Sequence, residues 1–188
     1  MKLKKLHLGC GSKKIEGYIN IDIQKGECVD VISDISALPY EAESVDEIYS
    51  CAAIEHFGRN DWENVIEHWH SILKKGGSLR ISTADFEACC LEYLENKKIE
   101  NLFGLIVGGQ KDYTDQHGMI FDFKFLKRQL EKIGFVNVRR YDWKEFHPFK
   151  NNKDYDDYSR SYLPHLDFTN GRLMMLNLIC EKQKGSKN

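Results

Sequence analysis

Three side chains in this sequence are suited to act as a general base, and each stands after a predicted strand or in a loop. His56 follows an apolar run that predicts a strand over residues 45–51, and Asp85 follows another at residues 78–82. His117 lies in a loop before a predicted helix. The pKa of a histidine lies near neutrality, which suits proton transfer. Each residue also has an ordinary explanation: a core or capping role for His56, a helix N-cap for Asp85 and a turn position for His117.

A glycine-rich turn, Gly9-Cys10-Gly11, follows the first predicted strand. Glycines at a strand exit let the backbone turn sharply and approach a ligand. Lys14 stands where a dinucleotide-binding turn has its third glycine, and the acid Asp22 comes 11 residues after Gly11 (22 − 11) rather than about 20. The short crossover disfavours a nicotinamide-linked oxidoreductase, because a pyrophosphate needs a helix N-terminus. An ordinary tight turn and a solvated carboxylate are the alternatives for these residues.

Two further segments favour a ligand that contains adenosine. Asp34 and Ile35 precede a Leu-Pro turn. There Asp34 could accept the exocyclic amine of an adenine while Ile35 packs on the ring; the alternative is an aspartate that caps its own turn. Asp22 could accept both hydroxyls of a ribose. The small residues Ala52 and Ala53 after a predicted strand leave room for a ligand.

The composition indicates one globular domain, residues 1–188. The chain is 41% hydrophobic and its formal net charge is −2, so neither a disordered chain nor a protein built for non-specific nucleic-acid binding is expected. No apolar stretch is long enough for a membrane span, and no signal peptide is evident. Six scattered cysteines without a CxxC pair suggest reduced thiols and a cytoplasmic location. No metal site is predicted, because His68 and His70 are two residues apart on a predicted helix and point in different directions.

The elements that must position these residues alternate between strands and helices. Helices are expected to begin at Asn60, with Glu63 completing a capping box and Gly76-Gly77 as the stop, at Asp85, with Leu91 and Leu94 on one side, and at Asp122, with Gly134 as the stop. This alternation predicts an α/β fold, a doubly wound, mostly parallel sheet between two helical layers, with ligands at the carboxyl ends of the strands. Strands are predicted over residues 6–8, 19–23, 45–51, 78–82, 135–140 and 174–181.

Residues 142–170 form an aromatic and charged insertion between the last two predicted strands. Such a long connection is usually functional or disordered, and its aromatic content favours order. We expect a lid over the carboxyl edge of the sheet in which Tyr158, Arg160 and His165 bind the substrate, with Arg160 suited to a carboxylate or phosphate. A packed extension or a homodimer contact is equally compatible with these residue types.

Taken in order, these segments resemble the class I S-adenosylmethionine-dependent methyltransferases of the methyltransferase type 11 group. The resemblance implies a Rossmann-like fold, S-adenosyl-L-methionine as the cofactor, and Glu55-His56 as an acid–histidine pair common at this position. It departs from the group at His7, where an acid is usual. Its short first crossover resembles a small subgroup associated with surface-glycan synthesis. The matching segments are Leu6–Ser12, Ile19–Ile23, Ser33–Tyr40, Ser44–Phe57, Ile72–Ser82 and Ile133–Val138. The cofactor-binding residues that it implies are Gly9, Cys10, Gly11, Asp22, Asp34, Ile35, Ala53 and His56.

The resulting functional expectation is S-adenosylmethionine-dependent methyl transfer to a small-molecule or glycan-related (saccharide) acceptor. The cofactor carries the difficult electronics of such a reaction, while the protein supplies position and, for an oxygen acceptor, a base. The alternative is a non-catalytic domain that keeps this fold to bind S-adenosylmethionine or a partner.

Overall fold

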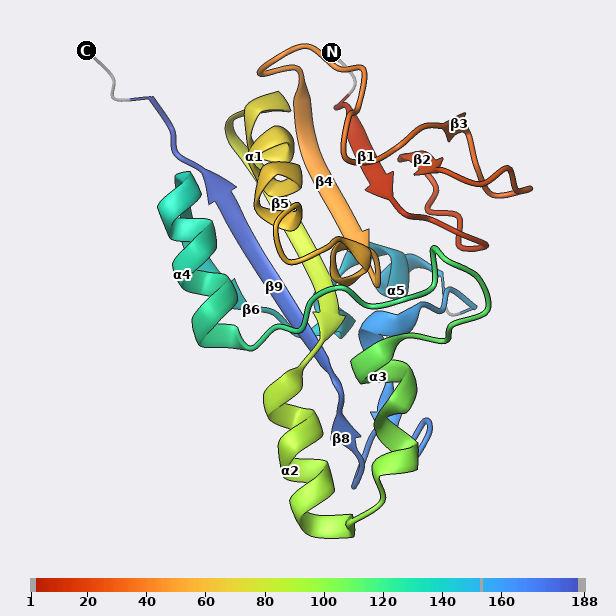
Figure 1. The fold of residues 1–188 in the computed structure, drawn as a ribbon. Helices are drawn as coiled ribbons and strands as arrows, with labels where there is room; N and C mark the ends of the chain where they lie inside the picture. The colour runs from red at the N-terminus through yellow and green to blue at the C-terminus, as the bar shows by residue number, and fades with distance from the viewer. Residues whose placement is uncertain (1–2, 153, 186–188) are drawn as a thin grey trace.

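The computed structural model describes residues 3–152 and 154–185, and it contains a seven-stranded sheet of order β3-β2-β1-β4-β5-β9-β6 (Figure 1). Six strands run parallel, and β9 is antiparallel to both of its neighbours. The doubly wound α/β class expected from the sequence is thereby confirmed. The strand bounds are β1 (Lys5–Leu8), β2 (Ile19–Asp22), β3 (Val31–Ile32), β4 (Val45–Cys51), β5 (Leu73–Ala84), β6 (Phe135–Arg140) and β9 (Met175–Lys182).

One face of the sheet is covered by α1 (Trp62–Ile72) and α4 (Phe123–Ile133), as Figure 1 shows. The helices bury apolar stripes at helical spacing against the strand residues that point toward them. Trp69 is fully buried, and its indole nitrogen donates to the carbonyl oxygen of Ile35 at 2.7 Å. This contact joins α1 to the segment that follows β3. The buried residues of the two helices are Trp62, Val65, Ile66, Trp69, Ile72, Leu126 and Leu130.

The expected N-caps are correct for α2 (Phe86–Asn96, N-cap Asp85) and α4 (N-cap Asp122) and wrong for α1. Asp122 caps α4 by accepting a hydrogen bond from the Phe125 amide at 2.7 Å, and Gly134 ends it at a φ of 115°. The predicted capping box at Asn60 does not form: α1 begins at Trp62, and the N-cap Asp61 makes no side-chain capping bond. The helix also ends at Ile72, before Gly76, because Leu73 is already extended and starts β5.

The second face lacks the helices that usually cover such a sheet. Residues 9–44, all of which the structure describes, contain turns and the short strands β2 and β3 but no helix. The insertion takes their place: α5 (His147–Asn151) lies behind the sheet in Figure 1. Phe146 packs on the ring of Tyr49 from β4 at 4.4 Å between centroids, and Tyr155 belongs to the same buried cluster. Part of the insertion before residue 160 therefore belongs to the core.

A buried carboxylate joins the insertion to the central strands. Asp157 Oδ2 accepts hydrogen bonds from the hydroxyls of Tyr49 at 2.7 Å and Tyr155 at 2.8 Å. Its other oxygen accepts from the backbone amide of Ser159 at 2.9 Å and from the Ser159 hydroxyl at 2.5 Å. The Ser159 carbonyl in turn accepts from the side-chain amide of Asn177 on β9 at 2.8 Å. Polar groups that would otherwise be buried without partners are satisfied in this way.

A smaller unit projects beyond the carboxyl ends of the strands (Figure 1). It consists of α2 (Phe86–Asn96), the 3₁₀ turn η2 (Ile99–Leu102), α3 (Phe103–Val107) and the hairpin β7 (Tyr162–Leu163) and β8 (Arg172–Leu173). Its core contains Ala88, Cys89, Leu102 and Met174. Leu91 and Leu94, the side expected to define α2, are instead exposed. Within residues 3–152 and 154–185, no helix has the length and apolar character needed to cross a bilayer.

The Asp157 contacts generate a prediction about stability. Asp157→Asn keeps the size of the side chain but places an amide donor against groups that donate to the carboxylate. We expect the free energy of unfolding to fall by about 1–3 kcal/mol, the cost of leaving buried donors unmatched. Urea unfolding of the full chain measures this. Asp154→Ala, at an exposed site in the same segment, is the control and should leave stability unchanged. Equal stability of the two variants would contradict the structural role of Asp157.

Candidate functional site

The turn after β1 has the conformation that its glycines were expected to allow. Gly9 and Gly11 adopt φ values of 66° and 52°. A Cβ on Gly9 would lie 2.7 Å from the Cβ of Ala53, so a side chain there would displace the segment after β4. A Cβ on Gly11 would meet nothing within 4 Å. Cys10 is buried between them, and its amide donates to Ile21 at 3.1 Å. The backbone is thus tightly packed at Gly9 and open at Gly11.

Asp22 lies at the end of β2 and faces this turn. Its carboxylate accepts hydrogen bonds from the backbone amides of Gly11 at 2.8 Å and Gln24 at 2.9 Å, one on each oxygen. Because a carboxylate oxygen can accept more than one hydrogen bond, both oxygens keep capacity for the hydroxyls of a ligand. The structure therefore brings the glycine turn and the Asp22 carboxylate into contact, as the sequence predicts.

The segment after β3 lies on the other side of the turn. Asp34 accepts from the amide of Ser36 at 2.8 Å, the self-capping turn considered as its alternative role. Ile35 is buried, and its side chain reaches within 4.0 Å of the Cβ position of Gly9. The apolar side chain of Ile35 thus lies beside the glycine turn, and Asp34 is its neighbour in the chain.

The strand exit after β4 is strained. Ala52 adopts a φ of 50°, uncommon for a residue with a Cβ, and strain of this kind clusters at functional sites. Its amide donates to Ser82 on β5 at 2.8 Å. The 3₁₀ turn η1 (Ile54–His56) follows directly and carries Glu55 and His56 to the carboxyl edge of the sheet.

The packing of His7 explains why a histidine stands where the family usually has an acid. It points to the opposite face, where its Nδ1 donates to the Oδ1 of Asn20 at 3.0 Å and its ring lies 5.3 Å from that of Tyr49. Burial lowers the pKa of His7, so the neutral form is favoured. His7 therefore belongs to the core beneath the insertion. The remaining residues fit S-adenosylmethionine: an open glycine turn, a carboxylate at the end of β2 and an apolar contact at Ile35.

A cavity of about 310 Å³ opens beside Ala52 at the carboxyl ends of β4 and β5. Its walls come from η1, α3, the loop that follows α3, and η4 (Tyr158–Arg160) in the insertion. Polar and apolar groups are mixed, as in sites that orient a small molecule. The lining residues are Ala52, Glu55, His56, Ala84, Asn101, Gly104, Leu105, Gly109, Lys111, Asp115, His117, Tyr158, Ser161 and Met175.

His56 and His117 meet in this cavity, with ring centroids 5.0 Å apart. Nδ1 of His56 lies 3.1 Å from the Gln116 carbonyl, and Nδ1 of His117 lies 3.1 Å from the Leu105 carbonyl. Since a carbonyl oxygen only accepts, each Nδ1 carries a proton, and in the neutral form of either ring the lone pair is on Nε2. Burial is the main cause that lowers the pKa of His117, and electrostatic repulsion from His56 is the second. In this tautomer the Nε2 atom of either neutral ring is able to accept a proton.

The backbone of Glu55 fixes the loop that carries His117. Its carbonyl accepts from the amides of Gly118 at 2.8 Å and Met119 at 3.1 Å. A Cβ on Gly118 would lie 2.6 Å from the Phe57 carbonyl oxygen, so only glycine permits this approach. The Glu55 side chain is 1% exposed, and burial raises its pKa.

The other predicted site residues are placed differently. Asp85 is buried as the N-cap of α2, and it pairs with Arg140 at 2.9 Å rather than lining the cavity. Arg160 pairs with Asp156 at 2.7 Å, and its guanidinium lies over the rings of Trp143, Phe149 and Phe168. His165 is exposed and is not among the lining residues. Of the three substrate residues expected in the insertion, the structure brings only Tyr158 to the cavity.

Several lining residues had no sequence signal. Asn101, Lys111 and Asp115 lie between α2 and α4, in a segment without periodicity or a recognisable motif. Their position depends on the hydrogen bonds that tie His117 and Gly118 to neighbouring segments, which a linear sequence does not reveal. Among the residues that the structure describes, no group of three or more His, Cys, Asp or Glu side chains is arranged to hold a metal ion.

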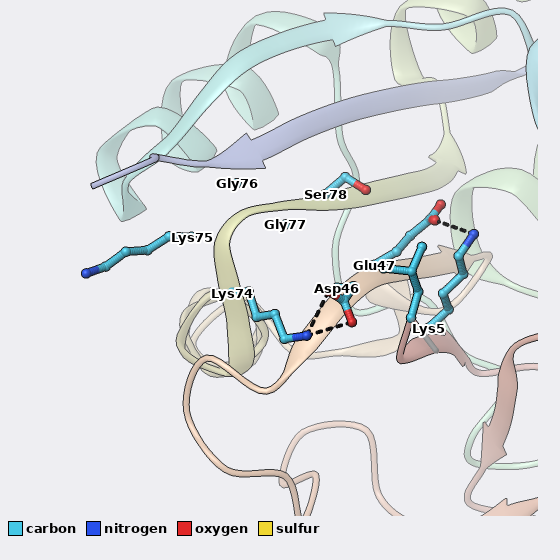
Figure 2. A pocket seen from close by; sticks show the side chains of 9 residues that line it. Lys5, Asp46, Glu47, Lys74, Lys75, Gly76, Gly77 and Ser78 are labelled. Carbon is cyan, nitrogen blue, oxygen red and sulfur yellow. Dashed lines mark hydrogen bonds and ion pairs between the residues drawn. The ribbon is translucent and has the colours of Figure 1, made fainter. Parts of the chain in front are cut away.

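A second hollow, of about 320 Å³, lies at the amino-terminal edge of the sheet (Figure 2). Figure 2 shows Lys74 paired with Asp46 and Lys5 paired with Glu47, at 2.8 Å and 3.1 Å. These charges neutralise each other, and the hollow is at the opposite end of the strands from the glycine turn. It is therefore separate from the candidate site.

Comparisons with known proteins agree with this arrangement. Residues 6–81 match the model of a family described as a methyltransferase domain. Comparison with curated protein sequences gives no significant match. Similar solved structures include an S-adenosylmethionine-dependent methyltransferase from Thermotoga maritima, described as a possible histamine N-methyltransferase, with 18% identity, a TM-score of 0.56, and coverage of 96% of this chain and 82% of that one.

Two other solved structures have similar TM-scores. A methyltransferase from Methanosarcina mazei shows 16% identity and a TM-score of 0.57 over 98% of this chain and 95% of its own. A putative methyltransferase from Haloferax volcanii, in complex with the activator Trm112, shows 11% identity and a TM-score of 0.57 over 100% and 85%.

The strand order, the single antiparallel strand and the glycine turn define the class I S-adenosylmethionine-dependent methyltransferase fold. Residues 6–81 match the methyltransferase domain model, and this match together with the fold implies S-adenosylmethionine as the cofactor.

The position of Asp22 generates a prediction about cofactor affinity. Asp22→Ala removes the carboxylate at the end of β2, and we expect binding of S-adenosylmethionine to weaken by about 1–3 kcal/mol because ligand hydroxyls lose a charged acceptor. Titration calorimetry measures the change. Glu27→Ala, an exposed acid in the next loop, is the control. Unchanged affinity in Asp22→Ala would remove this residue from the ribose site.

Proposed function

We propose that this protein catalyses methyl transfer from S-adenosylmethionine to a polar small molecule or saccharide that binds in the 310 Å³ cavity. The observation that carries the proposal is the pair His56 and His117, whose Nε2 lone pairs are available beside the strained exit of β4. General bases are most useful when their pKa lies near the working pH, which suits histidine.

In this proposal the glycine turn, Asp22, Asp34 and Ile35 hold the cofactor. Bound S-adenosylmethionine supplies an electrophilic methyl group on a sulfonium. The chain positions the acceptor for in-line attack and excludes water. His117 Nε2 accepts the proton of an acceptor hydroxyl, while the Leu105 carbonyl holds its Nδ1 proton. His56 is the second proton acceptor at the same opening.

The polar lining favours an acceptor that carries several hydrogen-bonding groups. Asn101, Lys111, Asp115, Tyr158 and Ser161 provide both donors and acceptors around the opening. Tyr158 is 62% exposed, so its ring is free to contact a bound molecule. In this proposal the part of residues 142–170 that contacts the acceptor is limited to the turn around Tyr158 and Ser161. The rest of the segment up to residue 160 covers the second face of the sheet.

The alternative is a domain that binds S-adenosylmethionine or a partner protein without turnover. One structural neighbour is a methyltransferase in complex with an activator protein. The two proposals differ in a single measurement. A catalytic protein releases S-adenosylhomocysteine when it is incubated with the cofactor and a panel of saccharides, alcohols, amines and carboxylates. A binding domain shows cofactor affinity by calorimetry but releases none with any of them.

Removal of the base should slow turnover while the cofactor stays bound. For an oxygen acceptor we expect His117→Gln to lower the rate of S-adenosylhomocysteine release by about 10²–10⁴-fold, the usual contribution of general-base catalysis. His56→Gln is the parallel variant that identifies which ring takes the proton. His165→Gln, at an exposed site away from the cavity, is the control. A normal rate in both cavity variants would contradict a histidine base.

The lowered pKa of His117 has a consequence for pH dependence. In the folded protein the pKa of His117 lies below its ordinary value of 6.5. At a pH between these two pKa values, His117 is protonated in the unfolded chain and neutral in the folded chain. We therefore expect the contribution of His117 to stability to be complete above pH 6.5 and to decline as the pH falls through the window below it. NMR titration, with the resonance assigned by His117→Gln, measures the midpoint. A midpoint above 6.5 would contradict the effect of burial.

A further inference from the structure

The loop of residues 108–117, which follows α3, connects the two parts of the candidate site. Its tip, residues 111–114, reaches the loop after β2, where the side-chain amide of Gln24 donates to the Thr114 hydroxyl oxygen at 3.3 Å. In Figure 1 this green loop extends from α3 toward that region. The cavity wall includes four residues of the same loop, which are Gly109, Lys111, Asp115 and His117.

Gln24 also contacts the proposed ribose site. Its backbone amide donates to one oxygen of Asp22 at 2.9 Å, and the other oxygen of Asp22 accepts from the Gly11 amide at 2.8 Å. A continuous series of hydrogen bonds therefore leads from the glycine turn through Asp22 and Gln24 to Thr114.

Thr114 is held in the orientation that this contact needs. Its amide and its hydroxyl both donate to one oxygen of Asp112, at 2.8 Å and 2.6 Å, and these bonds lower the pKa of Asp112. Because the single hydroxyl proton points to Asp112, the lone pairs of the Thr114 oxygen are free to accept from Gln24. Each donor of the contact therefore meets an acceptor.

The tip depends on this contact, whereas the neck of the loop is closed by its own backbone. The Gln110 amide donates to Asp115 at 2.9 Å, and the His117 amide donates to Val107 at 3.2 Å. In the part of the chain that the structure describes, the Gln24–Thr114 bond is the only hydrogen bond that joins residues 111–115 to residues outside the loop. Segments with few contacts open at low free energy.

The loop and the cofactor span the same two points. S-adenosylmethionine would extend from its ribose at Asp22 to its methyl group at the cavity beside Ala52. The loop runs from the cavity wall to Gln24, two residues after Asp22. A bound cofactor would therefore lie beneath the loop, and the tip must move aside before the cofactor can enter or leave.

We propose that Gln24 and Thr114 form a clasp that closes the loop of residues 108–117 over bound S-adenosylmethionine. The inference rests on the proposed cofactor site. Opening of the clasp admits the cofactor, and closing it slows its departure and excludes water. Closing also brings Lys111, Asp115 and His117 to the wall that the acceptor contacts. Gln24 and Thr114 are positioning residues, because they act through the loop.

The first test is cleavage of the full chain by chymotrypsin. Tyr113, at the tip, is 86% exposed, and a protease cuts such a site when the segment opens. S-adenosylhomocysteine occupies the cofactor site without donating a methyl group. We expect it to slow cleavage after Tyr113 by about tenfold at saturation. Cleavage after Phe168, in an exposed turn of the insertion, is the internal reference and should not change.

The second test is the rate at which S-adenosylhomocysteine dissociates, measured by stopped flow. Gln24→Ala keeps the backbone bond to Asp22 but removes the clasp, as does Thr114→Val. Each should speed dissociation about fivefold, the effect of one lost hydrogen bond. The double variant should be no faster than either single one, because both remove the same bond. Thr114→Ser keeps the hydroxyl and should restore the slow rate. Gln183→Ala, at an exposed site elsewhere, is the control.

The outcomes separate the clasp from the proposed activity. Calorimetry that shows bound S-adenosylhomocysteine, with no slower cleavage after Tyr113, overturns the clasp. Unchanged dissociation in Gln24→Ala and Thr114→Val, or additive effects in the double variant, also overturns it. Absence of binding overturns the clasp together with the cofactor site. Protection of Tyr113 without methyl transfer to any acceptor contradicts the catalytic proposal alone and supports the clasp.

Discussion

A parallel sheet must be covered on both faces, but residues 3–44 contain no helix that could cover one of them. Residues 9–44 pass from β1 to β4 through turns and two short strands. The missing layer is supplied by residues 142–160, which place Phe146 and Tyr155 against Tyr49 of β4 in a buried cluster. The bidentate role of Asp157, between two tyrosines and Ser159, holds this late segment on the early strands.

The same constraint explains why this face of the sheet is unusually polar. His7 and Asn20 bind each other there, and Arg80 of β5 pairs with Glu47 and lies over the Phe146 ring at 5.1 Å. These polar groups bind one another within the sheet, and the insertion adds the Phe146 ring over Arg80 and the Asp157 carboxylate that accepts from Tyr49. The substitution of histidine for the usual acid at residue 7 belongs to this packing and has no direct contact with the cofactor residues.

With both faces of the sheet covered, the candidate site lies at the carboxyl edge. The glycine turn, Asp22 and Ile35 converge because β1, β2 and β3 are neighbours in the sheet and end at the same edge. The turn η1, which follows β4, lies at the same edge. The Glu55 carbonyl in η1 accepts hydrogen bonds from the loop that carries His117 and so holds this loop at the cavity. The cavity is thus assembled from segments more than a hundred residues apart, since Ala52 and Met175 both line it.

The sequence by itself determined the features that depend on neighbouring residues. Apolar periodicity located α1, α2, α4 and six of the seven strands, Asp122 and Gly134 marked the ends of a helix, and the order of motifs identified the fold and the cofactor. These signals are readable because capping, turn geometry and strand burial act over a few positions. β3 was missed because two residues carry no period, and Asn60 was misassigned as a cap because the chain turns one residue later, at Asp61.

Only the tertiary structure decided which side chains are buried and which residues contact one another. Leu91 and Leu94 have the spacing of a buried stripe, yet α2 packs through Ala88 and Cys89 because the hairpin of β7 and β8 approaches from that side. Arg160 has the chemistry of an anion-binding residue, but Asp156 and three rings already surround it. His56 and His117 are 61 positions apart (117 − 56) and become a pair through contacts with the carbonyls of Glu55, Leu105 and Gln116. Contacts of this kind depend on the distance between segments in space, which the order of residues along the chain does not contain.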